Sequence, residues 1–587
     1  MSESVETAER APAWRTPVIA IVAILAIAIG VLAGSVLLSN RAAAVGSGAA
    51  YVPADAAFYV ELRLQPSEAQ DAALRDIIGR FPEIEELDLD RPLYDQLTER
   101  LDETLTDEGT DLSWEADIAP WFDGRVAVAV TDIPASAMEA PVDPMAAPEV
   151  PPTVMMLGVT DRDAAEAGIA RLLAAGGEGL PSFTTVQHRG FTIRVMEGSE
   201  YGAYALTDDQ LILGSDAEVI QAALDVHAEP AGSLSEMADM TKLTDTLPDD
   251  WLAFMTYDLN DVMAEAMAAG ASASPAVAEA FGSLMEHQSL RGAVAFSASE
   301  GRLLVDAAAD APTGPLAMEN VDRGLADEVP RDALYYSDAG NLGAGFAAVI
   351  QPMKQAIATT PDGEEQLRTF ESALGGDLEE LLSWIDDGAI AIGATGGEPW
   401  AGMVLVPNDM SAAERRLGQL ASFAGLGALD PSSGISVDEE DVDGVTVTTI
   451  RWEDPQAAPD IGMGLPTFSG VVVEYAVTED RALVGLGGTF VRGVLGLEAS
   501  DSLASEPRFG DALAEFGGSE NAGTVWVDLA GVRAAVETAL GPMIESGDPD
   551  GVYASEIRPW LLPFDRIVGV TRVEGDVMIQ RGALLFE

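Results

Sequence analysis

The residues best suited to acid–base or metal chemistry are three histidines, and they are scattered along the chain. They are His188, His227 and His287, and none lies in a His-Glu-x-x-His helix of the zinc-binding kind. The chain has no cysteine, which removes thiolate nucleophiles and cysteine-ligated metal sites. Ordinary surface or turn histidines are the favoured interpretation. We therefore assign no catalytic residue, no metal ligand and no cofactor.

Two short segments resemble ligand-binding loops. Residues 438–444 (DEEDVDG) alternate carboxylates as a calcium loop does, but they lack the distal glutamate of an EF-hand. A hairpin turn containing Gly444 is the favoured alternative. Residues 485–489 (GLGGT) lie between a predicted strand and a predicted helix, where phosphate cradles occur, yet no lysine follows them. We interpret this segment as a helix-capping turn.

Tryptophans and carboxylates supply the remaining candidates. Trp121 and Trp384 each precede a predicted strand, where a core aromatic is favoured over a sugar-stacking platform. Paired carboxylates could hydrolyse glycosides, but among 98 acidic residues no spacing singles out one pair.

The elements that carry these residues occur twice. Residues 52–59 (VPADAAFY) recur as 329–336 (VPRDALYY), and the later matches keep the same order. Trp121 matches Trp384 and Asp258 matches Asp528, at offsets that stay within roughly 254 to 277 residues. This pattern predicts a tandem duplication. A feature found in one copy only is then weak evidence for shared chemistry, and the histidines have no counterparts.

Each copy mixes helices and strands without a regular alternation of the two. Adjacent antiparallel strands with helices between them predict an α+β fold, here as two tandem homologous units with largely antiparallel sheets. In the first copy the period-2 and period-3.6 patterns predict strands at 57–64, 125–130, 153–159, 184–188, 191–196, 201–206, 210–213, 252–257, 290–297 and 302–306, and helices at 67–80, 92–105 and 161–174, around 219–224 and from 260.

The N-terminal region predicts a membrane anchor. Residues 17–38 contain no charge, and a helix of this length spans about 30 Å, the thickness of a bilayer core. Arg10 and Arg15 favour a cytoplasmic N-terminus. The small residues 42–44 leave a cleaved signal as the alternative. The predicted organisation is a cytoplasmic tail 1–16, a transmembrane helix 17–38, a linker 39–50, an exterior repeat 51–310, a linker 311–327 and an exterior repeat 328–587.

The charge of the chain restricts its partners. Its 98 acidic and 31 basic residues give a net charge of −67. Such a surface repels phosphate backbones, which argues against nucleic acid as a partner. The predicted partners are the membrane, through the N-terminal helix, and an envelope protein. The oligomeric state is not indicated.

Several motifs resemble one bacterial family. Residues 52–55 (VPAD), 116–128 (ADIAPWFDGRVAV) and 204–209 (YALTDD) are similar to the domain of unknown function 3352 family, over nearly the whole exterior. The resemblance implies a single-pass envelope protein. It implies no activity, ligand or catalytic residue.

Two classes of function follow from these observations. The first is a non-catalytic envelope protein that binds or scaffolds a partner, with a contact surface between the copies covered by the loops 135–149 and 456–467. The alternative is an envelope hydrolase that acts on glycan or peptide through carboxylates. An apolar cavity or a groove between sheets would favour the first class, and a cleft with two facing carboxylates, one with a raised pKa, would favour the second.

Overall fold

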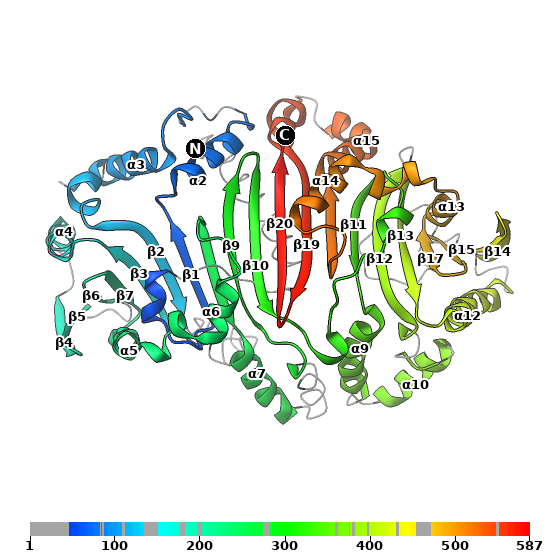
Figure 1. Ribbon diagram of the computed structural model, residues 1–587, viewed down its shortest axis with the longest axis horizontal. Coiled ribbons are helices and arrows are strands. Elements are labelled where there is room, and N and C mark those ends of the chain that lie inside the picture. The colour runs from blue at the N-terminus through cyan, green and yellow to red at the C-terminus, as the bar shows by residue number, and fades with distance from the viewer. Residues whose placement is uncertain are drawn as a thin grey trace, which may run out of the picture.

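One antiparallel sheet of 20 strands runs through the part of the chain that the computed structural model describes (Figure 1). The described residues are 46–82, 84, 87–107, 112–133, 151–175, 182–196, 202–273, 282, 285–358, 362–374, 376–378, 382–395, 398–429, 434–452, 471–547 and 551–587. The predicted α+β class is confirmed. The strands form a single sheet, whereas the sequence predicted a sheet in each unit.

The first ten strands form one side of this sheet, here called the first half, and the last ten form the second half. The first half contains β1 (Phe58–Arg63), β2 (Phe122–Val130), β3 (Thr153–Val159), β4 (Phe183–His188), β5 (Phe191–Met196), β6 (Ala203–Leu206), β7 (Gln210–Gly214), β8 (Ala253–Asp258), β9 (Arg291–Ser299) and β10 (Arg302–Asp310). The second half contains β11 (Ala333–Ala339), β12 (Ile385–Thr395), β13 (Glu398–Pro407), β14 (Ile435–Val442), β15 (Val445–Trp452), β16 (Val471–Val477), β17 (Ala482–Leu486), β18 (Gly523–Asp528), β19 (Phe564–Glu574) and β20 (Val577–Phe586).

The two halves have the same strand order, read from the outer edge to the centre. The first half runs β4-β5-β6-β7-β3-β2-β1-β8-β9-β10. The second half runs β14-β15-β16-β17-β13-β12-β11-β18-β19-β20. β10 pairs with β20 in the middle of the molecule (Figure 1). The shared order and registers define corresponding positions, such as Tyr59 with Tyr336 and Asp258 with Asp528.

Helices and short turns connect the strands and lie on the faces of the sheet. The α-helices are α2 (Glu68–Ile78), α3 (Leu93–Asp107), α4 (Arg162–Ala175), α5 (Ala217–Ala228), α6 (Ala238–Thr244), α7 (Asn260–Ala273), α9 (Leu342–Ala358), α10 (Gly363–Leu374), α12 (Met410–Ala428), α13 (Phe490–Leu495), α14 (Pro507–Phe516), α15 (Leu529–Gly547) and α16 (Arg558–Leu561). The short helical turns are η1 (Ser47–Tyr51), η2 (Trp114–Ile118), η4 (Pro230–Gly232), η5 (Leu234–Glu236), η6 (Gly314–Leu316), η7 (Leu325–Glu328), η8 (Ala499–Asp501), η9 (Leu503–Ser505) and η10 (Tyr553–Ile557).

Local capping signals place most of the predicted helix starts. The Ser67 hydroxyl accepts a hydrogen bond from the Gln70 amide at 3.2 Å and begins α2. Asp161 caps α4 in the same way, through the Ala164 amide at 3.0 Å.

The hydrophobic core occupies both faces of the sheet. Along β9, Ala293 and Ala295 join the core of the first half, while Val294 faces the other side because successive strand residues alternate. On that other side, Ala73 and Ile77 of α2 belong to a cluster that includes residues of β9, β10, β19 and β20. This cluster therefore packs the two halves against each other, in addition to the pairing of β10 with β20.

Two segments predicted to be linkers contribute to these cores. Ala49 of η1 is buried in the first half, and Leu325 of η7 is buried in the second. The predicted anchor 17–38 and the loops 135–149 and 456–467 lie outside the described residues. Among the helices that are described, none is both long and apolar enough to cross a bilayer.

Candidate binding site

Each half buries the same pair of side chains, a tyrosine and a carboxylate two residues apart on one strand. Tyr59 and Glu61 form the pair on β1, and Tyr336 and Asp338 form it at the corresponding positions of β11. A spacing of two residues places both side chains on the same face of the sheet. The Tyr59 hydroxyl donates to Glu61 Oε2, and the Tyr336 hydroxyl donates to Asp338 Oδ2 at 2.8 Å.

Burial dominates the electrostatics of both pairs. It raises the pKa of Glu61 and of Asp338 above their ordinary values, and the hydrogen bond from the tyrosine lowers each pKa only in part. Burial also raises the pKa of both tyrosine hydroxyls, and the charge of the adjacent carboxylate raises it further. Each tyrosine therefore stays protonated and remains a hydrogen-bond donor.

The two carboxylates differ in how completely they are bonded. Asp338 Oδ1 accepts a second hydrogen bond, from the Thr524 amide at 2.7 Å. Glu61 Oε1 is buried and has no hydrogen-bond partner among the described residues. An unsatisfied buried oxygen is costly, so the pair in the first half is the less favourable of the two.

The segments that cover the pairs also differ. In the first half Gly46 lies directly over Glu61, and a Cβ atom built there would come within 1.8 Å of Glu61 Oε2. The corresponding position in the second half is Arg323, whose Nε lies 3.3 Å from Asp387 Oδ2. Arg323 also donates to the Asn521 carbonyl at 2.9 Å. The longer glutamate side chain therefore has a glycine beside it, and the shorter aspartate side chain has an arginine at the corresponding position.

A cavity of about 270 Å³ borders the pair in the second half. Its lining combines carboxylates, neutral polar groups and apolar side chains. The lining residues are Asp322, Arg323, Gly324, Leu325, Ala326, Asp327, Tyr336, Asp338, Ala504, Phe509, Gly510, Leu513, Ser519, Asn521 and Thr524.

Large aromatic residues occupy the matching positions of the first half. Asn521 and Thr524 of the cavity correspond to Trp251 and Phe254, which are fully buried. The Trp251 and Phe254 rings lie 5.5 Å apart, and Phe254 packs edge-on against Tyr59 at 6.0 Å. Two aromatic rings are thus replaced by small polar side chains at these positions, while Trp526 takes the place of Thr256 on the same strand.

The candidates singled out from the sequence lie elsewhere and apart from one another. His188 Nε2 lies 2.8 Å from Asp225 Oδ1, the His227 ring stacks on Tyr51 at 4.1 Å, and the His287 carbonyl accepts from Thr313. No group of three or more potential metal ligands occurs among the described residues.

The two loop-like segments are turns. Asp443 and Gly444 have φ angles of 52° and 88° and connect β14 to β15, which confirms the hairpin interpretation. Gly487 and Gly488 connect β17 to α13 with positive φ angles, and Thr489 lies at the N-cap of that helix, although its side chain makes no capping hydrogen bond. In the first half Asp216 does cap its helix, accepting from two amides at 2.8 and 3.0 Å.

Trp121 and Trp384 are core residues, as predicted. They are 2% and 5% exposed and belong to separate hydrophobic clusters.

Comparison with known proteins identifies the family. The family model described as "Protein of unknown function (DUF3352)" matches residues 18–548, most of the chain. The chain belongs to the DUF3352 family. No curated protein matches this DUF3352 chain. Among solved structures, crystal form I of TP0453 is similar at 9% identity over 45% of this chain and 79% of that chain, with a TM-score of 0.21. Crystal form IV of TP0453 is similar at 10% identity over 44% and 92%, with a TM-score of 0.17.

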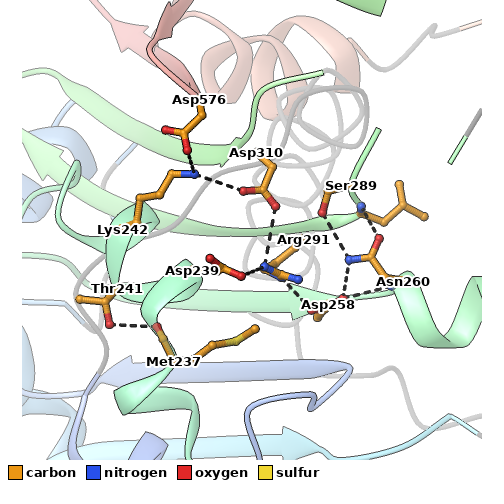
Figure 2. A network of polar contacts seen from close by, with 11 residues as sticks. Met237, Asp239, Thr241, Lys242, Asp258, Asn260, Ser289, Arg291, Asp310 and Asp576 are labelled. Atoms are coloured by element: carbon orange, nitrogen blue, oxygen red, sulfur yellow. Dashed lines mark hydrogen bonds and ion pairs between the residues drawn. The ribbon is translucent and has the colours of Figure 1, made fainter. Parts of the chain in front are cut away.

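A charged network joins the two halves of the DUF3352 protein near the end of β10 (Figure 2). Lys242 of α6 lies 3.6 Å from Asp310 and 2.7 Å from Asp576, which belongs to the turn between β19 and β20. Burial lowers the pKa of Lys242, but the contacts with Asp576 and Asp310 outweigh it and raise the pKa overall.

The same network continues into the first half. Arg291 bonds Asp258 and Asp239 at 2.8 and 2.9 Å (Figure 2). Each of the two cations contacts more than one carboxylate, so the network links α6, β9, β10 and the β19–β20 turn and is a structural support for the junction.

The signal for the buried pairs was present in the sequence. The repeated segments 52–59 and 329–336 end at Tyr59 and Tyr336, and the carboxylates follow two residues later in both copies. Extending the comparison of the copies by two residues finds them.

Proposed function

We propose that this DUF3352 protein is a non-catalytic binding protein of the cell envelope, and that the cavity of the second half holds its ligand. The observation that supports the proposal is the difference between the halves. The buried pair Tyr336–Asp338 borders an open space, while the same space beside Tyr59–Glu61 is filled by Trp251 and Phe254.

The charge of the cavity favours a small cation that also carries a hydrogen-bonding group. Asp322 and Asp327 are exposed lining residues, and Asp327 forms no ion pair within the described part of the chain. Asn521 and Thr524 supply buried polar groups, while Phe509 supplies an apolar wall. At about 270 Å³ the cavity is slightly below the usual range of ligand pockets, which begins at ~300 Å³. A compact hydroxylated ammonium compound fits these limits.

The bonding of Asp338 favours binding over hydrolysis. Both of its oxygens are engaged, one by the Tyr336 hydroxyl and one by the Thr524 amide. A general acid or base must instead present a carboxyl oxygen to the substrate. The hydrolase alternative therefore lacks support from this carboxylate, although its pKa is raised.

We further propose that the two halves arose by tandem duplication and are held outside the cell by residues 17–38. The common strand order of the halves and the repeated sequence motifs support the duplication. The uncharged length of 17–38 supports the anchor. Protease added to intact spheroplasts should digest the exterior and spare a cytoplasmic marker. Protection of the exterior would contradict this orientation, and release of the protein into the medium would indicate a cleaved signal.

A pair of glycine substitutions tests the cavity. Gly510 lies in α14 and lines the cavity, and Gly493 lies in α13; a Cβ atom at either position meets no other atom within 4 Å. Ethanolamine should raise the thermal midpoint of the full-length protein, and about ten times its dissociation constant should stabilise the fold by ~1.4 kcal/mol. Gly510→Leu should abolish this shift because the new side chain obstructs the cavity, and Gly493→Leu should retain it.

The control probe is ethylene glycol, which has the hydroxyl but lacks the ammonium. It should shift the midpoint less than ethanolamine does. Equal shifts in Gly510→Leu and Gly493→Leu, or no ethanolamine shift in the unmodified protein, would contradict the proposal.

A further inference from the structure

A second cavity, of about 220 Å³, lies in the first half between α4 and the strands β5 and β6. It is independent of the cavity in the second half. Its lining residues are Arg162, Glu166, Ile169, Ala170, Gly190, Thr192, Arg194, Tyr204 and Leu206. Two of these nine residues are arginines, in a chain where acidic residues outnumber basic ones by 98 to 31.

Arg194 carries a charge that no carboxylate neutralises among the described residues. It lies opposite Tyr204 in the register of β5 and β6, and its guanidinium carbon is 5.8 Å from the centre of the Tyr204 ring. The other arginine, Arg162, contacts Asp208 at 2.7 Å, but Asp208 has an 88% exposed side chain, so this pair is weakly held. An unpaired guanidinium in a concave site is a ready partner for an anion.

Tyr204 adds an unsatisfied hydroxyl beside this arginine. Its hydroxyl oxygen is buried and has no hydrogen-bond partner among the described residues. A buried hydroxyl without a partner costs free energy unless something bonds to it. The Thr192 hydroxyl accepts from Gln187 at 2.8 Å and can still donate its own hydrogen.

The corresponding positions of the second half show what this region looks like without a site. Tyr475 takes the place of Tyr204, and Thr448 takes the place of Arg194. There burial raises the pKa of Tyr475, and the nearby Thr448 side chain lowers it in part. The first half therefore has an arginine opposite its tyrosine where the second half has a threonine.

We infer that this cavity binds the carboxylate group of a small molecule, through the Arg194 guanidinium and the Tyr204 hydroxyl. The planar guanidinium matches the two oxygens of a carboxylate. Glu166 at the cavity repels a second negative charge, so a monoanion is preferred to a phosphate dianion.

Calorimetric titration of the full-length protein with sodium propionate tests the inference, with sodium chloride at equal ionic strength as the blank. Arg194→Thr installs the residue found in the second half and should weaken propionate binding by about 10- to 100-fold, because a charged hydrogen bond is lost. The matched control is Arg415→Thr, which removes an exposed arginine of α12 and should leave the affinity unchanged.

Tyr204→Phe separates a binding role from a structural one. It should weaken propionate binding severalfold while leaving the thermal midpoint unchanged or raised, because the hydroxyl has no protein partner to lose. Equal affinities in Arg194→Thr and Arg415→Thr would overturn the inference. So would inorganic phosphate binding more tightly than propionate, or a lowered midpoint in Tyr204→Phe.

Discussion

Trp251 in the first half and Asn521 in the second occupy corresponding positions beside the same buried pair, and they produce different interiors. Trp251 is fully buried, packs on Phe254 and lies under the Arg63 guanidinium at 3.8 Å. Asn521 is also buried, but its amide bonds the Gly518 carbonyl and the Thr524 hydroxyl. The strand order is the same on both sides, so the interiors differ in where each half places its large side chains, with Trp526 of the second half taking the place of Thr256.

The comparison also runs in the opposite direction. Near the outer part of the sheet it is the first half that has a cavity, beside Tyr204 and Arg194, where the second half has Tyr475 and Thr448. The two cavities therefore lie in different regions of the shared strand arrangement. Two copies of one scaffold can diverge in this way because each copy still keeps most of its core.

The largest expected effect comes from removing the aromatic core residue of the first half. Trp251→Ala should lower the free energy of unfolding by about 3–5 kcal/mol, since it deletes a fully buried ring and leaves a void. Asn521→Ala, its counterpart, should cost only about 1–2 kcal/mol, through lost hydrogen bonds. Urea unfolding of the full-length protein measures both. Equal losses of unfolding free energy would mean that the two positions pack alike, which would contradict the difference between the halves.

The next effect concerns the buried carboxylates and depends on pH. Burial raises the pKa of Glu61, so between its ordinary pKa and the raised one the folded state holds a proton that the unfolded state has lost. The free energy of unfolding should therefore fall as the pH rises through this interval. Glu61→Gln should remove the part of this decline that Glu61 causes. The difference in free energy of unfolding between this variant and the unmodified protein should therefore grow in favour of the variant from acid to neutral pH.

Two further variants, one at the corresponding carboxylate of the second half and one at an exposed glutamate, serve as controls for Glu61→Gln. Asp338→Asn should gain less stability at neutral pH than Glu61→Gln does. Both Asp338 oxygens accept hydrogen bonds, and an amide has only one oxygen. Glu103→Gln, at an exposed position of α3, should reproduce the pH profile of the unmodified protein. If Glu61→Gln also follows that profile, Glu61 does not carry the raised pKa.

Sequence patterns predicted the local elements well and the assembly less well. The alternation at 153–159 predicted β3 with the bounds that it has, and Ser67 and Asp161 marked helix starts correctly. The joining of the halves was not predicted, because alternation shows which face of a strand is buried and not which strand lies beside it. The apolar run of β20, buried on both faces, was the available sign of a central strand.

The candidate site was predictable only in part. Comparing the two copies residue by residue would have found the buried pairs, since Tyr59–Glu61 and Tyr336–Asp338 have the same spacing. The cavity was not predictable, because it depends on how Asn521 packs against distant residues such as Phe509.

The smallest expected effect lies where the halves meet. Asp306 of β10 and Arg581 of β20 correspond to each other and are also direct partners in the register, so this pair marks the symmetry centre of the junction. At such a centre, two identical copies would place the same residue opposite itself. This chain instead places opposite charges there, with Arg581 Nε 3.6 Å from Asp306 Oδ1. Arg581→Asp should therefore place like charges in contact, and the double variant with Asp306→Arg should restore the attraction. The Arg581 side chain is 52% exposed, so solvent screening limits the loss to about 1 kcal/mol or less, and salt should reduce it. Urea unfolding at low and high salt measures the effect. If the exchange of charges fails to recover the loss, the pair does not act across the junction, and the β10–β20 pairing, the apolar cluster beneath α2 and the Lys242 contacts hold the halves together without it.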